Sequence, residues 1–492
     1  MGCSTGGCRT GAFSPRRLAQ LAALILPLGA CQRQRPTDPR LVSEWIRTLY
    51  GAVRVERISA PVASRLFAYA ATGLYAGMAA VEPHLPPLAG RLNGLPALPK
   101  ADPSQHYDAT ITAVGAERLI LDTLFREGLP TTRAAIARLA DSLTTARAAF
   151  GVDSSTRARS EELGRRTGLA IVAWSHLDGF DSTRGRKYVA PSGPGLWVND
   201  SPLSTYATQN LSAASQLIAP DNPANALRSA NGSDRGLILD RPKKAGRSTL
   251  PASNMAGVTE PFWGANRPFA MARWDECPAP PPPAFSTSPG TPLYEEARHV
   301  YETNKHLMPE QKTIALYWAD NSAESGTPAG HWLSIAGQMV SERHLSAEKA
   351  AWVEMLTSVS LADAFIAAWG YKFKLNVIRP RTFIRATIDS TWEPAIPTPP
   401  FPEYLSGHST LSAAAAATLT AVLGPVPFDD STSVSIGHSV RRYTSFRAAA
   451  DEAGLSRIYG GIHYPSANIE GGSLGRCVAS RVLARFAGGS FP

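Results

Sequence analysis

Segments rich in alanine and leucine, with apolar side chains three or four positions apart, constrain this chain most strongly toward helix. The longest runs from Ala347 to about Asn376, where an apolar stripe follows one helix face. Similar segments precede and follow it, at Pro61–Val81, Tyr107–Phe125, Thr131–Phe150, Arg157–His176, Pro292–Val340 and Leu474–Phe486. No stretch shows the sustained alternation of a half-buried strand. The pattern therefore predicts an all-α protein.

The segment between these helical regions has a different composition. Residues 178–292 are rich in Gly, Pro, Ser and Asn, yet they contain several tryptophans that need a core to pack against. We expect ordered loops there, flanked by two helical halves that each resemble a four-helix bundle. The length of 492 residues alone allows one large domain or about three small ones, and we expect residues 41–492 to form one domain. The net charge of +9 is spread over this length and argues against a nucleic-acid binder.

The N-terminus carries the features of an export signal over residues 1–30. Three arginines precede the apolar run Leu18–Ala30, which is too short for a membrane-spanning helix of about 20 residues. The run ends in the letters LGAC, which resemble a bacterial lipobox and imply a lipid anchor at Cys31, followed by a tether over residues 31–40. A plain secretory signal is the alternative. Both interpretations predict an extracytoplasmic protein, and the anchor would place it on the periplasmic side or at the outer membrane.

Two cysteines remain once the chain up to Cys31 is set aside. Cys277 and Cys477 could pair in an oxidising compartment only if the fold brings them together. The sequence alone leaves that pairing open.

Two cations lie where the longest predicted helix ends. Lys372 and Arg379 are seven positions apart, so on a helix they would project to nearly the same side. Pro380 disfavours helix at Arg379, which indicates that the helix ends near this point. Two long cations that leave one helix end can clamp an oxyanion. Taken alone, they also fit an exposed basic face.

A second cluster lies in the proline-rich stretch Pro399–Ser409. Ser406, Gly407 and His408 precede an alanine-rich helical segment that begins near Leu411. Backbone N–H groups at a helix start attract anions, and glycine lets the backbone approach a ligand closely. Ser406 can donate a hydrogen bond, and His408 can exchange protons. Taken alone, these residues also fit an ordinary helix cap with a surface histidine.

A third cluster follows in the letters SRIYGGIH, which place Arg457 six positions before His463. The planar guanidinium of Arg457 suits an oxyanion, and the two glycines permit a turn. By itself this cluster also fits a capped helix end. Together the three clusters supply three cations, neutral donors and two imidazoles. That set fits a multiply charged oxyanion, with one histidine for attack or coordination and the other for proton transfer.

The order and spacing of these clusters resemble the superfamily of vanadium-dependent haloperoxidases and type 2 phosphatidic acid phosphatases (PAP2). The segment Trp318–Trp332 and the aromatic residue Phe401 resemble the bacterial haloperoxidase branch, and the strongest match lies in residues 311–475. The resemblance implies a vanadate cofactor, at which hydrogen peroxide oxidises a halide that then reacts with a small organic acceptor. The halide, the acceptor and the oligomeric state do not follow from the sequence.

The resemblance also implies a role for each motif residue. His463 would be the axial ligand of the metal, and His408 would be the catalytic acid and base. Asp320 would be the carboxylate that holds Arg457. The donors to the vanadate oxygens would be Lys372, Arg379, Ser406, Gly407 and Arg457, with Trp369 and Phe401 as aromatic walls.

Two positions depart from the family pattern. Leu405 stands where a proline usually precedes the serine, and Ala467 stands where an aspartate usually follows the second histidine. That aspartate would orient His463 as the nucleophile of a phosphatase, so its absence disfavours phosphoryl transfer more than halide oxidation. We therefore expect a haloperoxidase. The alternatives are a secreted acid phosphatase that forms a phosphohistidine, with phosphate in the site, and a silent lipoprotein that only binds oxyanions or a partner.

Overall fold

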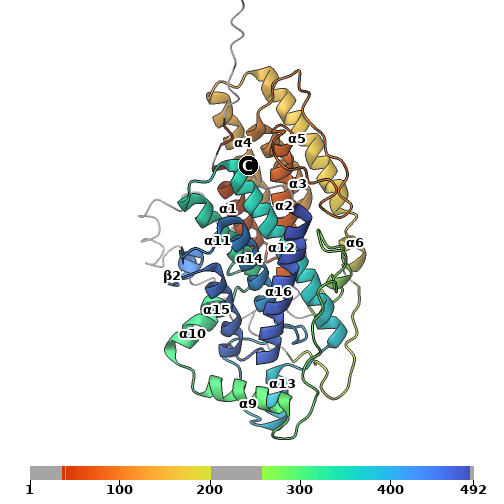
Figure 1. The fold of residues 1–492 in the computed structure, drawn as a ribbon, viewed down its shortest axis with the longest axis vertical. Helices are drawn as coiled ribbons and strands as arrows, with labels where there is room; N and C mark the ends of the chain where they lie inside the picture. Colours follow the sequence, from red (N-terminus) through yellow and green to blue (C-terminus); the bar gives the residue numbers. More distant parts are fainter. Residues whose placement is uncertain (1–35, 39, 185, 201–257, 488–492) are drawn as a thin grey trace, which may run out of the picture. The chain divides into compact units, whose positions relative to one another are not determined.

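The described part of the chain comprises residues 36–38, 40–184, 186–200 and 258–487 of a computed structural model. The expected signal peptide, Cys31 and most of the tether lie outside these residues. From Thr37 onward the described chain forms one unit. Its regular structure is almost wholly helical, with one two-stranded antiparallel sheet (Figure 1). The prediction of an all-α fold is confirmed.

Five helices make up the first half of the fold. They are α1 (Arg40–Val55), α2 (Ala60–Ala79), α3 (Ala109–Leu124), α4 (Pro130–Ala149) and α5 (Ser154–Ser175). α3 packs along α5 and also contacts α2 and α4. Glycine allows this close approach, since a Cβ added to Gly164 of α5 would lie only 2.3 Å from the carbonyl oxygen of Thr112 in α3. The sequence patterns located these helices to within a few residues, except α1.

A long helix, α12 (Ala347–Leu375), joins the two halves. It contacts α2 of the first half and both α14 (Gly407–Leu423) and α16 (Pro465–Phe486) of the second. The side chain of Ser346 caps its start, and Asn376 ends it in a left-handed conformation with φ of 49°. By length and composition α12 could cross a membrane, but its most apolar window is entirely buried inside the protein, as in the core helix of a bundle.

The second half contains further helices besides α14 and α16. They are α9 (Pro292–Lys305), α10 (Pro309–Tyr317), α11 (Thr327–Glu342), α13 (Pro380–Thr387) and α15 (Phe446–Tyr459), with the short helices α6 (Phe180–Thr183), η1 (Trp263–Ala265) and η2 (Thr432–Ile436) elsewhere. The predicted helical stretch Pro292–Val340 is thus three helices, two of which restart at a proline. Strands β1 (Phe428–Asp430) and β2 (Arg441–Tyr443) form the sheet. Three residues per strand are too few to produce a detectable alternation.

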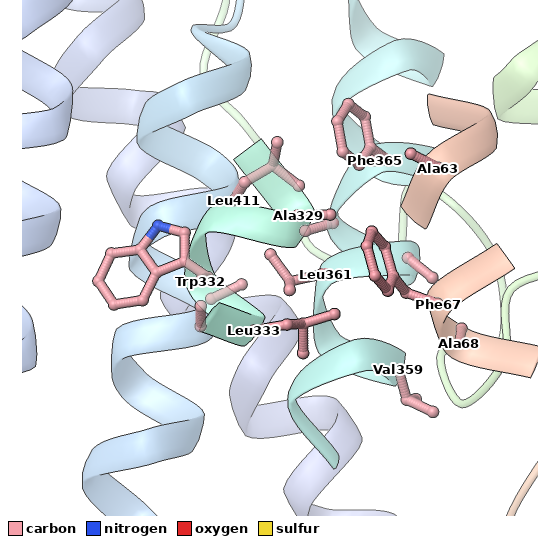
Figure 2. Close-up of a cluster of buried hydrophobic side chains, with 14 of the residues drawn as sticks. Ala63, Phe67, Ala68, Ala329, Trp332, Leu333, Val359, Leu361, Phe365 and Leu411 are labelled. Carbon is pink, nitrogen blue, oxygen red and sulfur yellow. The ribbon is translucent and has the colours of Figure 1, made fainter. Parts of the chain in front are cut away.

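The two halves share a core where α2, α11, α12 and α14 meet. Figure 2 shows Phe67 of α2, Trp332 of α11, Phe365 of α12 and Leu411 of α14 within this cluster. The indole Nε1 of Trp332 donates a hydrogen bond to Ser412 Oγ of α14 at 2.9 Å. Because Leu411 follows the second motif directly, this core fixes the helix start that carries the motif.

The described loops of the central segment are anchored on α12. Trp197, Trp263 and Phe269 are buried there, as the need for a packing partner suggested. Asp363 of α12 accepts hydrogen bonds at 2.6–2.9 Å from the backbone N–H groups of Phe269 and the two residues after it. The loop is therefore held by a wholly buried carboxylate. Residues 201–257 of the segment lie outside the described residues.

Cys277 and Cys477 form a disulfide, a pairing that the sequence left open. Their Cα atoms are 5.9 Å apart, and the residues are 200 positions apart in the chain. The bond ties the central loops to α16.

Replacing Cys477 by serine should lower the free energy of unfolding by about 2–5 kcal/mol, because the cross-link closes a long loop and restricts the unfolded chain. Denaturant unfolding, read by circular dichroism, measures this. Cys277→Ser should give the same loss, and a reductant should destabilise only the wild type. Equal stability of all three proteins would contradict the bond.

Candidate functional site

The three motif clusters meet at one cavity of about 210 Å³. Gly407 and His408 at the start of α14, Arg457 near the end of α15, and His463 in the following loop all line it. Trp369, Phe401 and Asp320 line it as well. Lys372, Arg379 and Ser406 lie against these residues, as the contacts below show. The structure therefore brings all the predicted site residues together.

Lys372 and Arg379 do not lie on one helix, so the argument from their seven-residue spacing is wrong. α12 ends at Leu375, and Asn376 turns the chain in a left-handed conformation. Arg379 is extended (φ −79°, ψ 152°) and precedes α13, as Pro380 predicts. The turn between the helices, and not a shared helix face, determines where the two cations point.

Both cations converge because they bind the same short stretch of backbone. Lys372 Nζ donates hydrogen bonds to the carbonyl oxygens of Pro402 and Glu403, at 3.1 and 2.9 Å. Arg379 Nε donates to the carbonyl oxygen of Phe401 at 2.9 Å. The ring of Phe401 lies about 5 Å from both charges, at 5.2 Å from Lys372 Nζ and 5.0 Å from Arg379 Cζ.

The aromatic walls lie beside these cations. The rings of Trp369 and Phe401 are 5.0 Å apart, and Trp369 Nε1 donates to the carbonyl oxygen of Thr259 at 3.1 Å. That bond fixes the indole between α12 and the central loops. The pocket around the cations is therefore partly apolar, which strengthens electrostatic interactions inside it.

Three buried cations share this site, and that excess of positive charge is its main electrostatic property. Lys372, Arg379 and Arg457 are at most 2% exposed. Burial lowers the pKa of Arg379 and of Arg457 to about 10, and it lowers that of Lys372 well below its usual value, helped by the charge of Arg379. Arg379 Nη2 is buried without a hydrogen-bond partner among the described residues. A multiply negative oxyanion would supply that partner and offset the charge.

The start of α14 offers neutral donors to the same point. Ser406 caps the helix: its Oγ accepts a hydrogen bond from the backbone N–H of Ser409 at 3.4 Å. It also lies 2.9 Å from the hydroxyl of Ser409, which contacts Asn468 Oδ1 as well. The hydroxyl of Ser406 can rotate to donate to a ligand oxygen. A Cβ on Gly407 would lie 3.5 Å from the ring of Trp369 and 4.0 Å from Lys372 Cε. Glycine therefore keeps open the space between these two side chains and the helix start.

His463 is held by a carboxylate that the sequence analysis did not identify. Its Nδ1 lies 2.8 Å from Oε1 of Glu403, which also accepts from the backbone N–H of Tyr464 at 2.9 Å. Nδ1 thus carries the proton, and Nε2 keeps a lone pair, to which Arg379 Nη1 points at 3.3 Å. Burial and the charges of Arg379 and Lys372 lower the pKa of His463 well below its usual value. A neutral ring with this lone pair has the chemistry needed of a donor ligand or a nucleophile.

Glu403 itself is wholly buried next to two cations. Burial raises its pKa to about 7, and the charge of Arg379 opposes that rise. It takes the orienting position that Ala467 leaves vacant in the family pattern. The signal in the sequence was a single acidic residue in an otherwise apolar and proline-rich approach, three positions before Ser406. Nothing in the spacing links it to His463, which lies 60 positions later.

The predicted contact between Asp320 and Arg457 is replaced by another pairing. Asp320 Oδ1 lies 2.9 Å from Nδ1 of His331. Arg457 Nη2 donates instead to the carbonyl oxygens of Ala315 and Trp318, at 3.2 and 2.6 Å. The charge of Asp320 still opposes the effect of burial on the pKa of Arg457. Asp320 therefore acts on Arg457 through its field.

His408 faces the other oxygen of Asp320. The distance from His408 Nε2 to Asp320 Oδ2 is 3.9 Å, and neither atom has a hydrogen-bond partner in the described chain. Burial lowers the pKa of His408 well below its usual value, and the charges of Arg457 and His331 act in the same direction. His408 is therefore neutral here and able to take a proton from a ligand.

Oxyanion binding should stabilise the protein. Vanadate or phosphate at a hundred times its dissociation constant should add about 2.7 kcal/mol to the free energy of unfolding, because only the folded chain gathers the three cations. A melting experiment with and without each anion measures this. Arg379→Met should abolish the response. Arg381→Met, two positions away and paired with Asp200 and Glu393, should keep it. Equal responses of the two variants would contradict the site.

Comparisons with known proteins agree with this geometry. The family model for the VCPO second helical-bundle domain matches residues 353–488. A bacterial vanadium-dependent iodoperoxidase is 30% identical and superposes with a TM-score of 0.74, covering 92% of this chain and 98% of that one. Two structures of bacterial vanadium-dependent chloroperoxidase share the fold. The holo form is 15% identical with a TM-score of 0.60, covering 92% of this chain and 99% of that one. The apo form is 13% identical with a TM-score of 0.58, covering 88% of this chain and 95% of that one. No curated protein matches significantly.

An all-α fold with a buried three-cation pocket and two histidines is the arrangement expected of an oxyanion-binding helical protein. The chain is 30% identical to the iodoperoxidase over nearly the full length of both chains, and this similarity assigns the chain to a superfamily. It belongs to the superfamily of vanadium-dependent haloperoxidases and PAP2 phosphatases.

Proposed function

We propose that this protein is a vanadate-dependent haloperoxidase, which oxidises a halide with hydrogen peroxide. The observation that carries the proposal is the unpartnered Nη2 of Arg379 among three buried cations, beside a histidine whose Nε2 keeps its lone pair. Vanadate, when bound, would supply a Lewis-acidic centre that activates peroxide toward a halide. The donor set fits this group, since an oxyanion needs several N–H and O–H donors and the metal needs one neutral nitrogen.

The side chains divide the work between binding and proton transfer. Lys372, Arg379 and Arg457 would neutralise the oxyanion, and Ser406 with the start of α14 would donate neutral hydrogen bonds. His463 would coordinate through Nε2, with its tautomer set by Glu403. His408, neutral and near the carboxylate of Asp320, would accept a proton from peroxide and later return one.

The cavity above the cations is larger than peroxide and a halide require. One side of its wall consists of Ile396, Pro397, Pro399 and Pro400, and Phe365 adds an apolar ring. This lining supports a small organic acceptor with apolar surface near the site.

The decisive assay uses purified protein with orthovanadate, hydrogen peroxide and a phenol dye, with bromide, chloride and iodide tested separately. We expect halogenation of the dye that depends on vanadate. Absence of vanadate-dependent turnover with all three halides would contradict the proposal.

A secreted acid phosphatase is the second candidate, and the Glu403–His463 pair is the observation that favours it. A nucleophilic histidine needs an oriented ring, and Glu403 supplies the carboxylate that Ala467 does not. Hydrolysis of an aryl phosphate, with trapping of a phosphohistidine, tests this function. Vanadate separates the two candidates, because it would inhibit the phosphatase and activate the peroxidase.

Glu403→Gln should weaken vanadate binding and lower turnover by about 10- to 100-fold, because partners of metal-bound histidines orient the ring. Calorimetry with vanadate and the halogenation assay measure the two effects. Glu296→Gln, an acid nearby that contacts Ser466, is the control and should retain both. Wild-type affinity in Glu403→Gln would show that Glu403 does not orient His463.

We also propose that the protein is exported and anchored at Cys31. The disulfide between Cys277 and Cys477 supports an oxidising compartment. Cys31→Ser should release the protein from the membrane fraction, and mass spectrometry of the wild-type N-terminus should find a lipid on Cys31. A non-lipidated N-terminus at another residue would favour a plain secretory signal.

A further inference from the structure

His331 lies behind the site, outside the cavity, and holds two carboxylates at once. It is on α11 and is wholly buried. Its Nδ1 lies 2.9 Å from Asp320 Oδ1, and its Nε2 lies 2.9 Å from Asp430 Oδ2 at the end of β1. Both carboxylates are buried as well.

With both carboxylates ionised, this arrangement needs a doubly protonated ring. A neutral imidazole has one N–H and could donate to only one of the two carboxylates. Burial alone would lower the pKa of His331, but the charges of Asp320 and Asp430 raise it to about 10. The ring also stacks on the indole of Trp318, with centroids 4.4 Å apart and an angle of 15° between the planes. An aromatic face stabilises such a cation further.

His331 connects to the site through the segment that carries both Trp318 and Asp320. Asp320 has φ of 48°, a left-handed conformation that is unfavourable for a residue with a side chain. With Oδ1 held by His331, Oδ2 is left facing His408 Nε2 at 3.9 Å. The carbonyl oxygen of Trp318 receives the hydrogen bond from Arg457. One buried ring therefore supports groups that contact two site residues.

We propose that His331 is a positioning residue that acts as a permanent imidazolium: it fixes Asp320 so that one carboxylate oxygen stays aimed at His408. The inference rests on the proposed function insofar as His408 is the acid and base. When His408 takes a proton, the aimed oxygen of Asp320 stabilises the charge without any rearrangement. Asp430 keeps His331 charged from the opposite side. Among the described residues, the ring of Tyr317 in α10 lies 5.6 Å from that of His331. The charge of His331 also acts on His438, in the loop after η2, and on His408.

The first test is independent of turnover. In protein labelled with ¹⁵N-histidine, His331 should show two ring N–H protons at pH 7.5, assigned by their loss in His331→Gln. If His331→Gln fails to fold, Asp430→Asn provides the assignment instead, because it leaves His331 in place. The chemical shift of one of the two His331 ring N–H protons should then change. A single ring N–H at His331 would overturn the imidazolium.

The second test separates positioning from general stability. His331→Gln should lower kcat by about 10- to 100-fold, with vanadate affinity and the halide KM within about twofold of wild type. Asp430→Asn should give a smaller loss in kcat alone. His438→Gln, whose ring lies 5.6 Å from that of Tyr317, is the matched control and should keep wild-type kcat. A folded His331→Gln with wild-type kcat would overturn the proposal.

The two proposals fail in different ways. If no halide is turned over, the proposed function fails. Two measurements then decide the inference. The first is the presence of two ring N–H protons on His331. The second is a change in the chemical shift of the His408 ring in His331→Gln, which we expect if Asp320 loses its orientation. An unchanged His408 signal in that variant would overturn the inference.

Discussion

His463→Ala should abolish vanadate-dependent turnover, with a loss of about a thousandfold or more, equivalent to about 4 kcal/mol of transition-state stabilisation. The variant loses the neutral Nε2 lone pair to which Arg379 points, and it leaves Glu403 buried without the ring that donates to it. The halogenation assay measures the loss, and calorimetry should show a parallel loss of vanadate affinity.

An exposed histidine provides the control for this change. His299 on α9 is exposed, and His299→Ala should keep wild-type turnover. Because His463 is also the nucleophile in the phosphatase alternative, the same variant should remove any aryl phosphatase activity. Turnover that survives His463→Ala in either reaction would rule out the role of this residue in that reaction.

His408→Ala should lower turnover by about 10²- to 10⁴-fold, the usual contribution of a positioned acid and base. Vanadate affinity should stay within a few-fold of wild type, because the donors on Lys372, Arg379 and Arg457 remain. Steady-state kinetics at saturating vanadate measure the first quantity, and calorimetry measures the second.

The contrast between the two histidines makes the assignment of roles testable. His463→Ala should reduce both affinity and turnover, whereas His408→Ala should reduce turnover alone. If His408→Ala weakens vanadate binding as strongly as His463→Ala does, His408 is a ligand and its assignment as the acid and base is wrong.

The helices could be predicted from sequence wherever local pattern dominates packing. The apolar stripe of α12 placed it to within a residue at either end. α16 begins at Pro465, nine residues before the predicted start at Leu474. Gly471, Gly472 and Gly475 around this border resemble helix breakers, yet a Cβ on Gly471 or Gly475 would clash with the start of α14. They serve a close helix contact, which is a long-range property that local pattern does not reveal.

The site was predictable in its composition and less so in its connections. Residue types and chain order identified the cations, the helix start and both histidines. The partners of those residues were not identified, because Glu403 meets His463 and Asp430 meets His331 across 60 and 99 positions. Contacts between residues so far apart in the sequence depend on how α12, α14 and β1 pack, and a sequence motif does not contain that information.

The continuity of α12 limits how evolution can exchange parts of this protein. The family model begins at residue 353, six residues inside a helix that starts at Ala347 and is buried along nearly its whole length. A crossover at that border would join the first turns of a core helix from one parent to the rest of it from another, within a helix that packs on α2 and α11. Homologous exchange should therefore succeed in the loops on either side of α12. We therefore expect the half that holds the candidate site to be exchanged only together with the whole of α12.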